Sequence, residues 1–198
     1  MGSVASPTEG PLAGGDAVLM PVKAFRRAKL RLAATLSPEE RRELARAMAT
    51  RVVISAGALP VAVVCDDEEV ADWANGLGAE VLWEPGKGLN GAVQAGFERL
   101  GALGAASVIV AASDLPLASN LARLADRRGV TVVPDRRNDG TNVISLRAGL
   151  PFRFGYGPGS FGRHLSEARR LGVPVRVVRS PELAWDVDLP EDLTGMRR

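Results

Sequence analysis

The chain is poor in the residues on which several classes of protein depend. Its 198 residues include one cysteine and one histidine. A single cysteine excludes a disulfide within the chain and a metal cluster built from cysteines. That residue, Cys65, follows the apolar run VAVV, which predicts a buried structural thiol.

Long apolar runs and an excess of one charge are also lacking. No stretch approaches the roughly 20 apolar residues of a membrane span, and no signal peptide is visible, so we expect a cytoplasmic protein without a membrane partner. The 25 Lys and Arg against 23 Asp and Glu leave a net charge of +2, which does not argue for nucleic acid as a partner. Positive residues gather in two short clusters at 26–31 and 135–137, which suit a small phosphorylated ligand better than a long polyanion.

Residues 1–16 are rich in Gly, Pro, Ala and Ser and have no periodicity, which predicts a flexible N-terminal tail. Residues 17–198 are enough for one domain with a proper core. Apolar runs predict strands at 17–22, 59–65, 79–84, 107–113, 130–135, 141–146 and 173–178. Amphipathic spacing and capping residues predict helices at 38–52, 67–78, 90–104, 119–129, 159–172 and 189–196.

The alternation of strand and helix predicts an α/β fold. The expected architecture is a mixed, mostly parallel central sheet with helices on both faces. Such folds bind ligands in a crevice beyond the carboxyl ends of the strands. The chemistry should therefore lie in the loops after Met20, Cys65, Ala112 and Val133.

Three carboxylates stand where that crevice is expected. Asp114 follows the apolar strand at 107–113, and as a single residue it is equally well explained as a turn residue before Pro116. Asp186 and Asp188 lie one residue apart, so in an extended segment they point to the same side, although either could cap the terminal helix. Carboxylates without nearby histidine or cysteine suit Mg²⁺ rather than zinc.

Cationic side chains follow the first strand. Lys23, Lys29 and Arg31 lie in a loop without glycine, so its side chains, rather than backbone N–H groups, would have to bind phosphate. A solvated charged loop is the alternative interpretation of this segment.

Two glycine-containing loops could hold an anion. Residues 139–143 (DGTNV) precede a strand, and residues 154–164 (FGYGPGSFGRH) precede a helix whose N-terminus lies near Ser160. Ser160 could equally be a plain N-cap. His164 falls inside this helix, where a packed or surface histidine is more usual than a general base. Asn90, at another helix start, either caps that helix or contacts a base or ribose.

The ordered set of motifs resembles a known family. PVKAFRRAKLRLA, LSPEERRELARAM, GLNGAV, SDLPL, DGTNVI, FGYGPGSFGRHL and WDVDLPEDL look like the CofC/FbiD guanylyltransferases of coenzyme F420 biosynthesis. That resemblance implies a nucleotidyltransferase fold related to the glycosyltransferase A type. It also implies transfer of GMP from GTP to phosphoenolpyruvate, which we favour, or to 2-phospho-L-lactate, with release of pyrophosphate.

The resemblance also implies roles for individual residues. Asp114 and Asp188 would bind Mg²⁺, with Asp186 beside them, and Lys23, Lys29 and Arg31 would meet the phosphates of GTP. Thr141, Gly157 and Ser160 would hold the phosphate of the phospho-acid, and Asn90 would face the nucleoside. One departure concerns residues 29–32, KLRL, because the family commonly has a hydroxyl residue between the two cations.

Three other functions remain open from the sequence. Asp186-Val187-Asp188 is formally the DxD of a glycosyltransferase, although such a pair normally lies mid-chain. A sugar-1-phosphate or molybdopterin nucleotidyltransferase would usually begin with a glycine-rich loop. A non-catalytic nucleotide-binding relative is the third alternative, which the retained carboxylates disfavour. The sequence leaves open whether the chain forms an oligomer.

Overall fold

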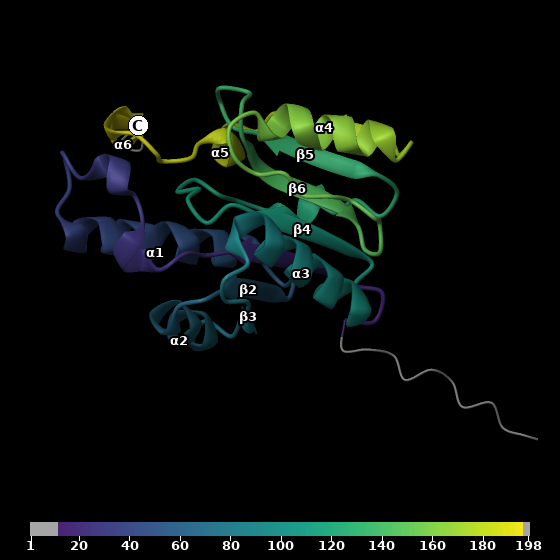
Figure 1. Ribbon diagram of the computed structural model, residues 1–198, viewed down its shortest axis with the longest axis horizontal. Coiled ribbons are helices and arrows are strands. Elements are labelled where there is room, and N and C mark those ends of the chain that lie inside the picture. The colour runs from purple at the N-terminus through teal and green to yellow at the C-terminus, as the bar shows by residue number, and fades with distance from the viewer. Residues whose placement is uncertain (1–11, 196–198) are drawn as a thin grey trace, which may run out of the picture.

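The computed structural model describes residues 12–195 (Figure 1). The predicted tail at 1–16 lies mostly outside this range. Residues 12–16 belong to the fold, which corrects the prediction for them. The backbone N–H of Leu12 donates to Leu103 O at 3.2 Å and that of Gly14 donates to Gly104 O at 2.9 Å. These bonds and the packing of the Leu12 side chain on the core hold this segment.

The centre of the molecule is one seven-stranded sheet, with the order β3-β2-β1-β4-β6-β5-β7. The pairs β1–β2, β1–β4, β2–β3 and β5–β7 are parallel, and β6 runs antiparallel to both β4 and β5. A mixed, mostly parallel sheet was predicted and is confirmed. The strands are β1 (Asp16–Pro21), β2 (Val61–Cys65), β3 (Glu80–Trp83), β4 (Ser107–Ala111), β5 (Val130–Pro134), β6 (Thr141–Arg147) and β7 (Val175–Val177).

Helices cover both faces of the sheet, and each face has its own apolar core (Figure 1). One core joins the sheet to α1 (Pro38–Ser55) and α2 (Glu68–Gly76), and the other joins it to α3 (Gly88–Ala102) and α4 (Ser160–Arg170). Ser37 caps α1 with a complete capping box that includes Glu40, as the sequence predicts. Two short helices, α5 (Pro181–Ala184) and α6 (Pro190–Gly195), follow β7.

The helix predicted at 119–129 is wrong. Only a 3₁₀ turn, η3 (Leu121–Leu124), forms there, because side chains and backbone compete with helical bonding. Asn120 adopts a left-handed conformation with φ 41°, and the Asp126 carboxylate accepts the backbone N–H groups of Arg128 and Gly129. The helix α5 was not predicted. Two further 3₁₀ turns, η1 (Phe25–Arg27) and η2 (Leu30–Leu32), shape the loop after β1.

Cys65 is buried at the end of β2 and its thiol is free, which confirms its prediction as a structural residue. Within residues 12–195, no helix combines the length and apolarity needed to cross a membrane.

Candidate active site

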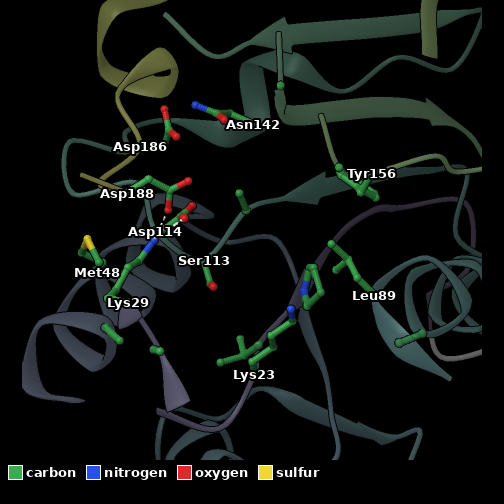
Figure 2. Close-up of a pocket in the computed structure, with 18 of the residues that line it drawn as sticks. Lys23, Lys29, Met48, Leu89, Ser113, Asp114, Asn142, Tyr156, Asp186 and Asp188 are labelled. Carbon is green, nitrogen blue, oxygen red and sulfur yellow. Dashed lines mark hydrogen bonds and ion pairs between the residues drawn. The ribbon is translucent and has the colours of Figure 1, made fainter. Parts of the chain in front are cut away.

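A cavity of about 700 Å³ opens at the edge of the sheet where the parallel strands β1, β2 and β4 end. This is the place that the strand pattern predicts. Residues at the ends of several elements line it. After β1, β2 and β4 these are Lys23, Lys29, Arg31, Asp66, Ser113 and Asp114, and Cys65 ends β2. The others lie around the start of β6, before and at the start of α4, and near the C-terminus: Asp139, Thr141, Asn142, Gly157, Ser160, Asp186 and Asp188. Figure 2 shows acidic side chains toward one side and Lys23 with Leu89 toward the other.

Asp114 and Asp188 converge on one cation. The Lys29 ammonium donates to Asp114 Oδ2 at 2.6 Å and to Asp188 Oδ1 at 3.0 Å (Figure 2). Arg31, which is mostly exposed, adds a long contact of 4.0 Å to Asp188. Burial lowers the pKa of Lys29, but the two carboxylates raise it more, so the ammonium stays charged. The structure therefore brings together Asp114, Asp188, Lys29 and Arg31, and their roles toward Mg²⁺ and GTP stay predictions.

The two carboxylate segments are also joined through their backbones. The N–H of Val187, between Asp186 and Asp188, donates to Asp114 O at 3.3 Å. This bond joins the loop after β4 to the segment between α5 and α6, so the backbones that carry Asp114 and Asp188 lie side by side.

An ion pair that the sequence analysis missed clamps the same segment. The buried Asp192 carboxylate accepts the N–H groups of Asp188 and Leu189 at 2.8 Å each and pairs with Arg136. Arg136 also donates to Asp186 O at 3.1 Å and stacks over the Trp185 ring. The capping role of Asp192 could be predicted from the sequence. A proline often begins a helix, and an acidic residue at the third helical position is typical of half a capping box.

Asp186 occupies a different environment from Asp188. It is 8% exposed, and its Oδ1 has no hydrogen-bond partner among the described residues. Burial raises its pKa, and the negative charge of Asp114 raises it further. Figure 2 places Asp186 beside Asn142, whereas Asp188 points toward Asp114 and Lys29. The predicted metal residue therefore lines the cavity but is not part of the carboxylate pair.

The opposite wall is the glycine loop, residues 155–159, which comes directly before α4. Gly157 and Gly159 have φ of 113° and 73°, a left-handed backbone that side chains other than glycine rarely adopt. The N–H of Gly159 donates to both carboxylate oxygens of Asp139 at 3.1 Å, which joins this loop to the one before β6. Gly159 is the N-cap of α4, so Ser160 is its first residue and not the cap.

Thr141 and Ser160 line this wall and are almost fully buried. The Thr141 hydroxyl lies 3.0 Å from Nδ1 of His164, and the other ring nitrogen of His164 accepts the N–H of Gly155 at 3.0 Å. The sequence favoured a packed or surface histidine over a general base, and His164 is fully buried in α4, so the structure shows the packed form.

Asn90 and one basic cluster are not where they were expected. The lining residues contributed by α3 are Gly88, Leu89 and Ala92. Asn90 Oδ1 instead accepts the N–H of Tyr156 at 2.7 Å, and the N-cap of α3 is Lys87. In the basic cluster at 135–137, Arg136 and Arg137 both face Asp192 rather than a ligand. Both departures arise from tertiary partners that lie far away in the sequence.

Lys23 after β1, Asp66 after β2 and Glu84 after β3 also line the cavity. Lys23 is exposed. Glu84 pairs with Lys87 at 2.7 Å.

For a metal ion, the described residues offer a two-carboxylate arrangement rather than a complete cage. No group of three or more His, Cys, Asp or Glu side chains in residues 12–195 is arranged to hold an ion. The convergence of Asp114 and Asp188 on one ammonium nevertheless shows that both can bind a single cation. Mg²⁺ commonly takes one or two protein carboxylates and completes its shell with water and substrate phosphates, so these residues fit that ion.

Known proteins resemble this chain over nearly its whole length. The family model described as "Guanylyl transferase CofC like" matches residues 16–196. A phosphoenolpyruvate guanylyltransferase of Rubrobacter xylanophilus is 41% identical, over 90% of this chain and 91% of its own. A 2-phospho-L-lactate guanylyltransferase of Methanothermobacter thermautotrophicus is 39% identical, over 88% of this chain and 81% of its own.

Solved structures share the fold. A nucleotidyl transferase from Methanothermobacter thermautotrophicus superposes with a TM-score of 0.67 at 20% identity, covering 92% of this chain and 95% of that one. A cytidylyltransferase from Leptospira borgpetersenii gives a TM-score of 0.62 at 13% identity, covering 93% and 85%. The nucleotidyltransferase fold that was predicted is thus confirmed.

Proposed function

Because the chain belongs to the CofC family of guanylyltransferases, we propose that it transfers GMP from GTP to a three-carbon phospho-acid and releases pyrophosphate. The observation that carries this proposal is a single cavity with two walls of different chemistry. The carboxylate pair with Lys29 and Arg31 stands on one wall, and the glycine loop with Thr141 and Ser160 stands on the other.

The chemistry needs positioning and charge neutralisation more than proton transfer. An oxygen of the substrate's phosphate forms a bond to the α-phosphorus of GTP, and the bond from that phosphorus to the bridging β-phosphate oxygen breaks. A phosphate monoester is largely dianionic at neutral pH, with a second pKa of about 6, so no general base is required. This agrees with a histidine that lies behind the cavity wall.

The protein's own side chains and backbone supply the charge neutralisation and the positioning. Lys23, Lys29 and Arg31 would neutralise the triphosphate, and Thr141, the Gly157 backbone and Ser160 would hold the phospho-acid in line with the α-phosphorus. In this proposal Asp114 and Asp188 hold Mg²⁺, with Asp186 close by. When bound there, the ion would offset the charge of the triphosphate and the leaving pyrophosphate.

For the acceptor we favour phosphoenolpyruvate over 2-phospho-L-lactate, on the name of the relative that is 41% identical. A relative named for 2-phospho-L-lactate is 39% identical, so both acceptors belong in the test. Because the motifs of this chain resemble those of the guanylyltransferases of coenzyme F420 biosynthesis, we propose that the reaction belongs to that pathway.

The test follows pyrophosphate release with GTP, Mg²⁺ and, in separate reactions, phosphoenolpyruvate, 2-phospho-L-lactate and 3-phosphoglycerate. We expect release with one of the first two, less with ATP in place of GTP, and none after chelation of the metal. Absence of release with all three acceptors would contradict the proposal and favour another nucleotidyltransferase activity.

Two variants test the assignment of the walls. Asp114→Asn should abolish release while the protein stays folded, whereas the exposed carboxylate control Asp72→Asn should behave as wild type. Ser160→Ala should raise the KM for the phospho-acid more than the KM for GTP. An equal effect on both KM values would mean that the glycine loop has been assigned to the wrong substrate.

A further inference from the structure

His164 is the only histidine of the chain, and it lies behind the cavity wall without reaching the cavity. Its side chain is fully buried. The cavity lining within residues 12–195 includes Thr141 and Ser160 but not His164. Both ring nitrogens have a partner nevertheless, so this side chain belongs to a polar network and is not simply packed.

The two hydrogen bonds determine where the ring carries its proton. The N–H of Gly155 donates to Nε2 at 3.0 Å, and a backbone N–H can only donate, so Nε2 must be the unprotonated nitrogen. In the neutral ring the proton is then on Nδ1, which faces the Thr141 hydroxyl oxygen at 3.0 Å. Nδ1 therefore donates, and Thr141 Oγ1 accepts.

This direction leaves the hydroxyl proton of Thr141 available. A hydroxyl has one proton and two acceptor positions, and the bond from His164 uses one of those acceptor positions. Thr141 lines the cavity between the glycine loop and the carboxylates, so its free proton can be donated to a ligand there. With the opposite tautomer, the hydroxyl would donate to Nδ1 and would offer an anion only its lone pairs.

We propose that His164 is a positioning residue, which holds the Thr141 hydroxyl as a hydrogen-bond donor to the phosphate group of the phospho-acid. This role rests on the proposed function for the identity of the ligand. Through Gly155 the same ring also fixes one end of the glycine loop, so one side chain organises two elements of the anion-binding wall.

The surroundings of His164 keep the ring neutral. The rings of Phe152, Phe154 and Tyr156 pack around it, with centroids at 5.8, 6.3 and 5.0 Å. Arg163 on the same helix is the charged neighbour that acts on it, and burial together with that charge lowers the pKa of His164 to about 4. The ring therefore keeps one proton and one fixed direction of donation at neutral pH.

The tautomer can be read directly by nitrogen NMR of protein labelled with ¹⁵N-histidine. A single histidine gives unambiguous signals, provided that the protein carries no histidine tag. We expect the neutral Nδ1–H form, unchanged between pH 6 and 8. The neutral Nε2–H form, or a proton taken up within that range, would overturn the proposal whether or not the protein turns out to be a guanylyltransferase.

Matched variants separate the two bonds of the ring. His164→Gln places an acceptor near the position of Nε2 and loses the donor to Thr141, whereas His164→Asn keeps a donor near the position of Nδ1 and loses the acceptor for Gly155. If His164 acts through Thr141, His164→Gln should raise the KM for the phospho-acid by about threefold to tenfold and leave the KM for GTP nearly unchanged. His164→Asn should change that KM less.

Combining His164→Gln with Thr141→Val distinguishes positioning from general structural support. Thr141→Val alone removes the hydroxyl and should raise the KM for the phospho-acid by about tenfold or more. The double variant should then be no worse than Thr141→Val, since His164 has no donor left to orient. Multiplied effects in the double variant, or equal changes in both KM values, would refute the positioning role while turnover by the wild type still supports the proposed function.

Discussion

Arg136 and Asp192 form the ion pair that fixes the segment carrying Asp186 and Asp188, and we predict that this pair is coupled energetically. Asp192 is fully buried, and the Arg136 side chain is only 24% exposed. Asp192 also receives two backbone N–H groups. Burial raises the pKa of Asp192, but these bonds and Arg136 lower it to below its usual value. The carboxylate is therefore charged and fully committed to its partners.

The expected magnitudes follow from what each substitution leaves behind. Removing one partner of a buried pair typically costs 3–5 kcal/mol. Arg136→Met should cost about 3 kcal/mol, at the low end, because Arg137 remains 3.5 Å from the carboxylate. Asp192→Asn should cost about 2 kcal/mol, since the amide oxygen can still accept the backbone N–H groups. The double variant should cost about 3 kcal/mol, which gives a coupling of about 2 kcal/mol.

Urea unfolding of the four proteins measures this cycle. Arg42→Met, which breaks the more exposed pair between Arg42 and Glu39 and the contact of Arg42 with Glu69, is the control and should cost less than about 1 kcal/mol. Turnover by Arg136→Met should also fall, by about tenfold or more, because the backbone of Asp186 and Asp188 loses its anchor. Additivity of the two single costs to within about 0.5 kcal/mol would refute the coupling.

Three further predictions concern other parts of the molecule. In the absence of nucleotide, Lys29→Met should bind Mn²⁺ about threefold to tenfold more tightly, because the Lys29 ammonium competes with the metal for Asp114 and Asp188. Turnover by the same variant should fall. Weaker binding in a Mn²⁺ titration would contradict this competition. The pKa of His164 is about 4 in the folded protein and about 6.5 in the unfolded chain. The contribution of the neutral His164 ring to stability is therefore complete above pH 6.5. It is lost as the pH falls toward 4, by up to about 1.4 kcal/mol per pH unit. The wild type should therefore lose more stability than His164→Gln between pH 7 and 5 in urea unfolding. Gly129→Ala should destabilise by about 2 kcal/mol or more, since its Cβ would lie 2.2 Å from Pro174 O, whereas Gly162→Ala in α4 has open space and should not destabilise.

The rule that ligands bind beyond the carboxyl ends of parallel strands accounts for much of what the sequence could predict. Asp114 follows β4 and Lys23 follows β1, so both positions depend only on recognising a strand and its end. The helix at 119–129 shows the limit of such local patterns. The spacing of apolar residues there favours a helix, but the Asp126 carboxylate accepts the backbone N–H groups of Arg128 and Gly129 instead. Hydrophobic periodicity does not reveal such side-chain bonds.

The residues that the sequence could not place depend on partners far away in the chain. Arg136 is 56 positions from Asp192, and Asn90 is 66 positions from Tyr156. A cluster of arginines in a loop has the same appearance in a sequence whether it faces a ligand or a buried carboxylate. The role of His164 likewise depends on Gly155 and Thr141, which only the packing of α4 on β6 brings to the two sides of one ring.

The antiparallel strand β6 explains how two walls of opposite chemistry meet in one cavity. In a wholly parallel sheet the start of a strand lies at the edge away from the ligand. β6 instead runs against β4, so its first residue, Thr141, lies where β4 ends and Asp114 follows. The pairing of Ala111 with Val143 and the bond from Ala112 N–H to Asn142 O fix this register. A slip of one residue would turn the side chains of β6 to the other face, so the register that closes the core also sets the separation between the carboxylates and the hydroxyl that would hold the two substrates.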